Sequence, residues 1–214
     1  MELPLFPLST VLYPGLPIPL RVFEERYRQM FDRVLDGERR FGVVAIVPAQ
    51  GVGEPADYQA IGCMAEVREV RHHPDGRLDV VARGEHRFRI EGVTQSAPYI
   101  VADVATLSET AGDAAEERMA PVGRLFNRYV TTLLEIVGED EVEAMDLPDD
   151  PVAASYLVAG VLQVDLPDKQ RLLASTSAAE RLRAEVGLLR RELALLECSG
   201  IAGPARLSVS FSLN

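Results

Sequence analysis

The chain is poor in several residue types from which active sites are commonly built. Its 214 residues include one lysine, Lys169, two cysteines, three histidines and no tryptophan. Neither Gly-Lys-Ser nor Gly-Lys-Thr occurs, so the chain lacks a phosphate-binding loop. Schiff-base catalysis and a Ser–Lys catalytic pair both require a lysine, so Lys169 is the only position at which either could occur. Because G-x-S-x-G and G-x-G-x-x-G are absent too, we expect a protein that is not an enzyme, with no catalytic residue and no cofactor.

The few cysteines and histidines do not form a metal-binding pattern. Cys63 and Cys198 are far apart, whereas a secreted disulfide scaffold would be denser in cysteine. His72 and His73 precede a Pro-Asp-Gly turn, and no cluster of further ligands accompanies them at metal-binding spacing. His86 could serve as a base for Cys63, but nothing in the sequence brings the two together. We therefore expect buried thiols, an exposed turn and no metal site.

Charge and hydropathy limit the classes of partner. The 22 basic and 33 acidic residues give a net charge of −11 and a pI near 4.8, which disfavours nucleic acid because phosphate binding depends on basic side chains. The apolar N-terminus lacks the basic start of a signal peptide, and no run is long enough to span a membrane. We expect a cytoplasmic protein with no membrane partner. Prolines also interrupt that N-terminal stretch, at Pro4, Pro7, Pro14, Pro17 and Pro19.

The hydrophobic pattern predicts an α+β protein in two parts. Residues 1–107 are β-rich and form a small antiparallel barrel or sandwich with one inserted helix, Val22–Leu35. Ser108–Glu117 is polar and predicts a flexible connection. Residues 118–200 predict a helical bundle, and the tail 201–214 alternates like a short terminal strand. The predicted strands of the first part are Leu3–Phe6, Phe41–Val47, Gly62–Arg71, Leu78–Ala82, His86–Val93 and Tyr99–Leu107.

The second part carries clear helix starts. Asp149-Asp150-Pro151 combines an acidic N-cap with proline at the first helical position, Leu166-Pro167-Asp168 opens a further helix, and Ser177–Glu180 has the form of a capping box. Gly138–Asp150 holds seven carboxylates and no basic residue, which is typical of a solvated acidic loop. The last helix has a leucine-rich stripe that favours packing on the other helices over a coiled coil. The stripe consists of Leu182, Val186, Leu189, Leu193 and Leu196.

Several short motifs follow one another along the chain: Leu3–Leu8, Val11–Gly15, Pro19–Leu20, Phe23–Tyr27, Phe41–Val44, Ile61–Ala65, Asp75–Arg77, Gly84–Phe88, Lys169–Leu173 and Arg181–Leu182. In their order and spacing they resemble the N-terminal domain of Lon proteases. The resemblance implies a PUA-like fold followed by a helical bundle, and a role in recognising substrates. The ATPase and peptidase domains of those enzymes lie downstream and are missing here, which implies a free-standing substrate-binding-domain protein. Its implied partners are unfolded or specific client polypeptides, with a Lon-type protease as a further candidate.

A binding site for polypeptides requires exposed apolar surface or a free strand edge. The proline-rich segment is denied full sheet pairing by its prolines, so we predict that Tyr13, Leu16 and Ile18 bind client polypeptides, together with the loop 49–58. Phe23 and Tyr27, one helical turn apart in the motif, are expected to pack beneath the sheet.

Two other functions are compatible with parts of the sequence. PUA-like folds can bind RNA, and arginines on neighbouring strands could form a basic patch despite the acidic total. A small-molecule hydrolase would require a deep pocket with perturbed titratable groups, and no motif indicates one. The arginines of the RNA-binding alternative are Arg68, Arg71, Arg77, Arg83, Arg87 and Arg89.

Overall fold

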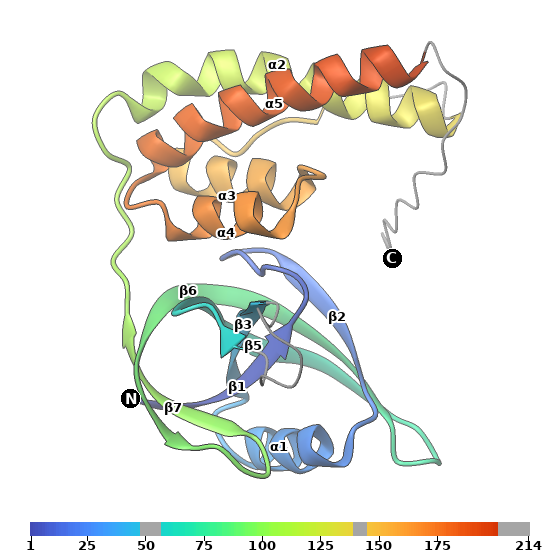
Figure 1. Cartoon of the computed structure of the whole chain (residues 1–214), viewed down its shortest axis with the longest axis vertical. Coiled ribbons are helices and arrows are strands. Elements are labelled where there is room, and N and C mark those ends of the chain that lie inside the picture. Colours follow the sequence, from blue (N-terminus) through green and yellow to red (C-terminus); the bar gives the residue numbers. More distant parts are fainter. Residues whose placement is uncertain (48–56, 139–144, 201–214) are drawn as a thin grey trace.

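The chain folds into a strongly curved sheet stacked against a group of helices (Figure 1). A computed structural model describes residues 1–47, 57–138 and 145–200. The sheet and helix α1 (Glu25–Asp36) form the lower half of Figure 1, and the helices after residue 114 form the upper half. The α+β class predicted from the sequence is confirmed. The predicted terminal strand, in 201–214, lies outside the described residues, as do residues 49–56 of the candidate loop.

The sheet closes on itself. Its order is β1-β7-β6-β5-β3-β4, and β1 also pairs with β3. The β1–β3 pair is parallel, so the all-antiparallel prediction was wrong for this pair. A parallel pair requires a crossover connection, here made by β2 and α1. The strands are β1 (Glu2–Leu8), β2 (Pro17–Val22), β3 (Arg40–Val47), β4 (Asp57–Tyr58), β5 (Ile61–His72), β6 (Leu78–Gln95) and β7 (Ile100–Thr106).

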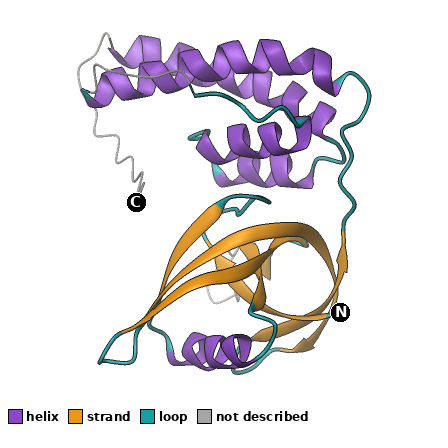
Figure 2. Cartoon of the chain, turned by 180° about the vertical axis from the view of Figure 1, so that it is seen from behind, coloured by secondary structure: helices purple, strands orange, loops and turns teal. Residues whose placement is uncertain are grey.

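Strand β6 connects most of the sheet, because it pairs with β5, β7 and β2 (Figure 2). The sequence predicted two separate strands, Leu78–Ala82 and His86–Val93, whereas the structure has one continuous strand of 18 residues. Register shifts along β5–β6 and β6–β7 let these long strands curve. Gly84 permits close approach, since a side chain there would overlap the Tyr13 backbone carbonyl. The predicted turn before β6 is present, with Gly76 at φ +81°.

Helix α1 starts later than predicted. Val22 is the last residue of β2, where it pairs with Leu78 and is buried. Phe23 lies between β2 and α1 and is 64% exposed, so the prediction that it packs beneath the sheet was wrong. Tyr27 does pack inward, with its ring 4.5 Å from that of Phe6 in an edge-to-face contact. Helical spacing could not reveal that the chain is still extended at Val22.

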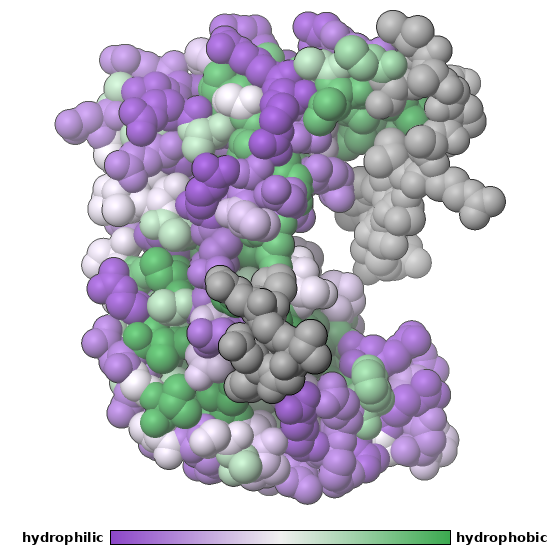
Figure 3. All heavy atoms as spheres, viewed as in Figure 1, coloured by the Kyte–Doolittle hydropathy of each residue, from purple (hydrophilic) through white to green (hydrophobic). Residues whose placement is uncertain are grey.

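The described part of the upper half contains four helices: α2 (Ala115–Val137), α3 (Pro151–Val161), α4 (Leu166–Ala174) and α5 (Ala178–Gly200). The side chain of Asp150 accepts the N–H of Ala153 at 2.9 Å, and Asp165 caps α4 in the same way. Leu182, Leu189 and Leu193 of α5 are buried against α2, α3 and α4, as the packing interpretation predicted. In the described ranges, no helix combines the length and apolar character needed to cross a membrane. Figure 3 shows apolar residues of one face in patches over the sheet and between the helices.

The cap of α3 gives a direct test of this local structure. We predict that Asp150→Ala lowers the free energy of unfolding by about 1 kcal/mol, because the Ala153 N–H loses its acceptor. Asp149→Ala is the matched control, since that neighbouring side chain is exposed and does not cap the helix. Urea denaturation of both variants measures the difference, and equal stabilities would contradict the capping role.

Candidate functional site

The few cysteine and histidine side chains do not gather into a metal-binding group within the described ranges. The described residues contain no cluster of three or more His, Cys, Asp or Glu side chains that could hold a metal ion. Burial raises the pKa of the Cys63 thiol, which disfavours the reactive thiolate. His73 lies 2.7 Å from Asp79 on the β5–β6 hairpin, and a hydrogen bond to this histidine lowers the pKa of Asp79. Asp79 lies within the sheet, where it pairs in register with Arg21 of β2 and Arg71 of β5.

An apolar groove is the best candidate for a binding site. It has a volume of about 410 Å³ and lies among β1, β2, the start of α1 and the end of β3. Apolar side chains from four segments converge on it, so it is a feature of the folded sheet. Phe6 and Leu20 belong to the buried core, and they supply an apolar surface at its base. The apolar lining consists of Phe6, Pro7, Leu8, Ile18, Pro19, Leu20, Val22, Phe23, Tyr27 and Ile46.

The second feature of this groove is a strand edge. Among the described strands, β2 pairs only with β6, and its residues Ile18–Val22 line the groove together with Phe23, which follows the strand. In antiparallel pairs, successive residues point their N–H and C=O groups alternately toward and away from the partner. Pro17 and Pro19 have no N–H, so they suit positions whose polar groups point away from β6. The outer edge of β2 therefore offers carbonyl acceptors but few donors.

The groove has an apolar rim with a small number of charges. Phe23 is the most exposed large apolar residue of the described chain. Next to it, the Arg26 guanidinium lies 4.6 Å from the centre of the Tyr27 ring and pairs with Glu24 at 2.8 Å. Such pairing leaves little net charge at the rim. The arrangement can accept an apolar, extended segment and offers hydrogen-bond acceptors along its length.

The residues predicted to bind polypeptides do not form one surface. Tyr13 is 1% exposed, and its hydroxyl donates to the Lys169 carbonyl at 2.9 Å, across to the helices. Leu16 is half-buried and packs over Gly160 of α3, where a side chain would overlap it. Ile18 is 8% exposed and lies in the sheet core, at the groove. Tyr13 and Ile18 thus lack the exposure on which the prediction rested, and binding by these three residues stays a prediction.

The six arginines of the alternative interpretation are also dispersed. Arg87 is buried, whereas Arg71, Arg83 and Arg89 are exposed. Carboxylates alternate with them: Arg83 pairs in register with Glu66, and Arg71 with Asp79. Arg68 forms an ion pair with Glu66 at 2.7 Å, and Arg77 forms one with Asp75 at 2.7 Å. These contacts neutralise part of the positive charge, and RNA binding by these residues stays a prediction.

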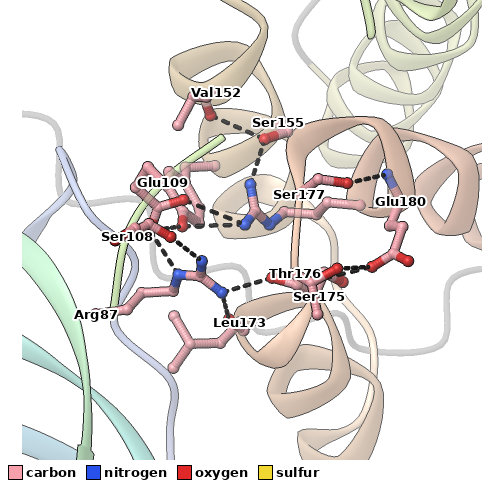
Figure 4. Close-up of polar contacts among 12 residues, drawn as sticks. Arg87, Ser108, Glu109, Val152, Ser155, Leu173, Ser175, Thr176, Ser177 and Glu180 are labelled. Carbon is pink, nitrogen blue, oxygen red and sulfur yellow. Dashed lines mark hydrogen bonds and ion pairs between the residues drawn. The ribbon is translucent and has the colours of Figure 1, made fainter. Parts of the chain in front are cut away.

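A buried polar cluster joins the sheet to the helices (Figure 4). Arg87 of β6 donates to Glu109 at 2.5 Å and to the backbone carbonyls of Leu173 and Ser175 at 2.8 and 2.5 Å. Glu109 also accepts the Tyr156 hydroxyl at 2.6 Å. Glu109 belongs to the segment predicted to be a flexible connection, so that prediction missed its role. The polar composition of Ser108–Glu117 suggested that the segment is exposed to solvent. The partners of Glu109 come from elements distant in sequence and could not be inferred from its neighbours.

A second arginine extends this cluster into the helices. Arg181 of α5 donates to the Ser155 hydroxyl at 2.7 Å and stacks 3.8 Å from the centre of the Tyr156 ring. One turn further along α5, Glu185 is completely buried, and neither of its carboxyl oxygens has a hydrogen-bond partner among the described residues. Burial raises the pKa of Glu185 well above its ordinary value, and the nearby Arg181 opposes this shift.

Comparisons with known proteins agree on one relationship. A family model described as the ATP-dependent protease La (LON) substrate-binding domain matches residues 2–191. The Lon protease of Cytophaga hutchinsonii is 25% identical over 201 residues, and that of Xanthomonas oryzae pv. oryzae is 29% identical over 201 residues. These alignments cover 91% and 90% of this chain but 25% and 23% of the two proteases. The chain thus spans about a quarter of the length of these relatives.

Solved structures support the same fold. The Lon N-terminal domain protein from Xanthomonas campestris aligns with a TM-score of 0.62 at 25% identity, covering 86% of this chain and 95% of that one. The N-terminal domain of the Mycobacterium avium complex Lon protease aligns with a TM-score of 0.69 at 20% identity, covering 89% and 98%. Both alignments include the sheet and the helices.

The joint between the sheet and the helices, formed around the buried Arg87, gives a prediction about stability. We expect Arg87→Ala to lower the free energy of unfolding by about 3–5 kcal/mol, because it removes one partner of a buried ion pair. Arg89→Ala, two residues along β6 and exposed, should change it by no more than about 0.5 kcal/mol. Chemical denaturation measures both, and a small effect of Arg87→Ala would show that the joint does not depend on this contact.

The buried carboxyl of Glu185 predicts a pH dependence. Because its pKa is raised in the folded state, it contributes stability below its unfolded pKa, and this contribution is lost as pH rises toward the folded pKa. Glu185→Gln is neutral at every pH. We therefore expect its advantage over the parent protein to grow from pH 4 to pH 7 in denaturation curves, and a constant difference would contradict a protonated Glu185.

Proposed function

Because the chain belongs to the family of Lon substrate-binding domains, we propose that it binds extended, apolar segments of unfolded polypeptides in the groove beside β2, without catalysing a reaction. The observation that carries this proposal is the apolar groove of about 410 Å³ with a strand edge beside it and Phe23 exposed at its rim. An unfolded client can bury the exposed Phe23 ring together with the apolar lining of the groove. The family description supplies the class of ligand.

The groove would hold a client by two kinds of contact. Client side chains bury apolar area against the lining, and client N–H groups donate to the carbonyls of the β2 edge. Because Pro17 and Pro19 provide no donors, a client strand cannot complete a full ladder there. The missing N–H donors also disfavour pairing between the β2 edges of two copies of the chain. Binding at this site is therefore reversible and tolerant of client sequence.

The proposal also includes the domain boundaries, the cellular location and the partners that were predicted from the sequence. We treat the closed sheet, residues 1–107, as a PUA-like domain, residues 118–200 as a helical bundle and 201–214 as a tail. The setting is the cytoplasm, with client polypeptides as the partners and a Lon-type protease as a further one. RNA binding is the less favoured function, since Arg87 is buried and both Arg68 and Arg77 have carboxylate partners.

Replacing the rim phenylalanine tests the proposal. We predict that Phe23→Ala raises the Kd for a labelled, permanently unfolded client by about tenfold, because the client loses most of the area of one aromatic side chain. The melting temperature should not fall, since Phe23 makes little contact with the core. Fluorescence anisotropy with reduced, carboxymethylated α-lactalbumin measures the Kd.

The matched control is Val93→Ala. Val93 is also an exposed apolar residue, 47% exposed, but it lies on β6 and does not line the groove. Its substitution should leave the Kd unchanged. Equal Kd values for the parent protein and Phe23→Ala would contradict binding in this groove, and no binding by the parent protein would contradict the proposed function itself.

A further inference from the structure

Among the described strands, the curved sheet is open between β2 and the second half of β1. Strand β7 pairs with β1 at Glu2–Leu5, and β3 pairs with it at Leu5–Leu8. Because Leu5 pairs with both, β7 and β3 lie on opposite edges of β1. Phe6–Leu8 therefore has one edge without a described partner, as β2 does. Both edges line the groove of about 410 Å³, and two strand edges facing one groove are the arrangement that an added strand requires.

The sequence that follows α5 predicts a strand suited to this position. Residues 201–214 lie outside the described ranges, but within them 207–213 alternate apolar residues with serines, which is typical of a strand with one apolar face. These seven residues include no charged one, and β2 has six. The Gly203-Pro204 pair before them is a turn signal, which suits a reversal of the chain after α5. The alternating residues are Leu207, Ser208, Val209, Ser210, Phe211, Ser212 and Leu213.

The tail 201–214 is long enough to return from α5 to the sheet. Arg191 of α5 pairs with Asp168 of α4 at 2.7 Å, and the next carbonyl of α4 accepts the hydroxyl of Tyr13, which lies just before β2. The helix continues from Arg191 to Gly200, about 14 Å at 1.5 Å per residue. Residues 201–206 span up to about 20 Å when extended, so they can bring the chain back toward β2. In Figure 1 the end of α5 and β2 lie on the same side of the molecule.

We propose that residues 207–213 bind in the groove beside β2 as an added strand and so compete with client polypeptides. This inference rests on the proposed function, because it takes the same groove as the client site. The apolar face of the tail covers the groove lining, its serines face solvent, and its N–H groups donate to the carbonyls of the β2 edge. The absence of N–H donors at Pro17 and Pro19 keeps the contact weak, so a client displaces the tail.

The tether makes this weak contact effective. A segment joined to the same chain by a short connection has an effective concentration at its site of about millimolar. The tail therefore covers the apolar groove when clients are scarce and leaves it when they are abundant. A tail from a second copy lacks this advantage, which is why we assign the strand to the same chain.

Substitutions in the tail of the full chain test its binding without any client. Val209→Asp combined with Phe211→Asp places two charges on the apolar face. Hydrogen–deuterium exchange should then become at least about threefold faster in residues 207–213, corrected for intrinsic rates, and in Ile18–Val22. The matched control is Ser208→Asp combined with Ser210→Asp, which places the same charges on the serine face and should exchange at the parent rate. Equal exchange in the three proteins overturns the inference.

The same proteins show whether the tail competes with clients. The Kd for reduced, carboxymethylated α-lactalbumin should fall by at least about threefold in the Val209→Asp, Phe211→Asp protein and stay unchanged in the control. Faster exchange with no change in Kd would overturn the competition, because clients would then bind elsewhere. If none of the three proteins binds the client, the proposed function fails, and the exchange measurement still decides whether the tail binds beside β2.

Light scattering decides which copy supplies the strand. The parent protein should be a monomer at the concentrations used for exchange, with the same protection of Ile18–Val22 after tenfold dilution. A dimer that the Val209→Asp, Phe211→Asp protein no longer forms would assign the strand to a second copy and overturn binding within one chain.

Discussion

The guanidinium of Arg87 is the group on which the arrangement of the two halves depends. It is 2% exposed, and a buried charge is tolerated only when it is paired and hydrogen-bonded. Its partners come from Glu109 after β7 and from the carbonyls at the end of α4. These contacts hold α4 against the sheet, while Tyr13 and Leu16 complete the joint with apolar area. With Tyr13 and Leu16 used in this way, the next residues of the same segment, in β2, line the open groove.

Local chemistry was predictable from the sequence, and long-range contacts were not. The Pro74–Gly76 turn and the Asp150 cap were predicted, because each depends on residues next to one another. The boundary at Val22 was missed, since apolar spacing of three and four fits both the end of β2 and the start of α1. The role of Glu109 was missed for a different reason: a polar segment in the sequence suggests solvent, and only the fold supplies its arginine. At the groove, the proline-rich segment was identified, but Phe23 was expected to be buried.

The groove beside β2 is apolar, has little net charge at its rim and presents backbone carbonyls, which suits unfolded segments of many sequences. The contacts of Arg87 lie between β6, Glu109 and the end of α4, and none of these residues lines the groove. The contact between sheet and helices therefore leaves the edge of β2 open.

Hydrogen–deuterium exchange with and without a permanently unfolded client tests the central claim most directly. Binding beside β2 predicts slower amide exchange in Ile18–Tyr27 and at the end of β1 when the client is added, because these backbone groups line the groove. Exchange in α4 and in Ala178–Arg191 of α5 should not change with this client. Protection confined to the helices, or unchanged exchange along β2 and at Phe23 under saturating client, would contradict the account.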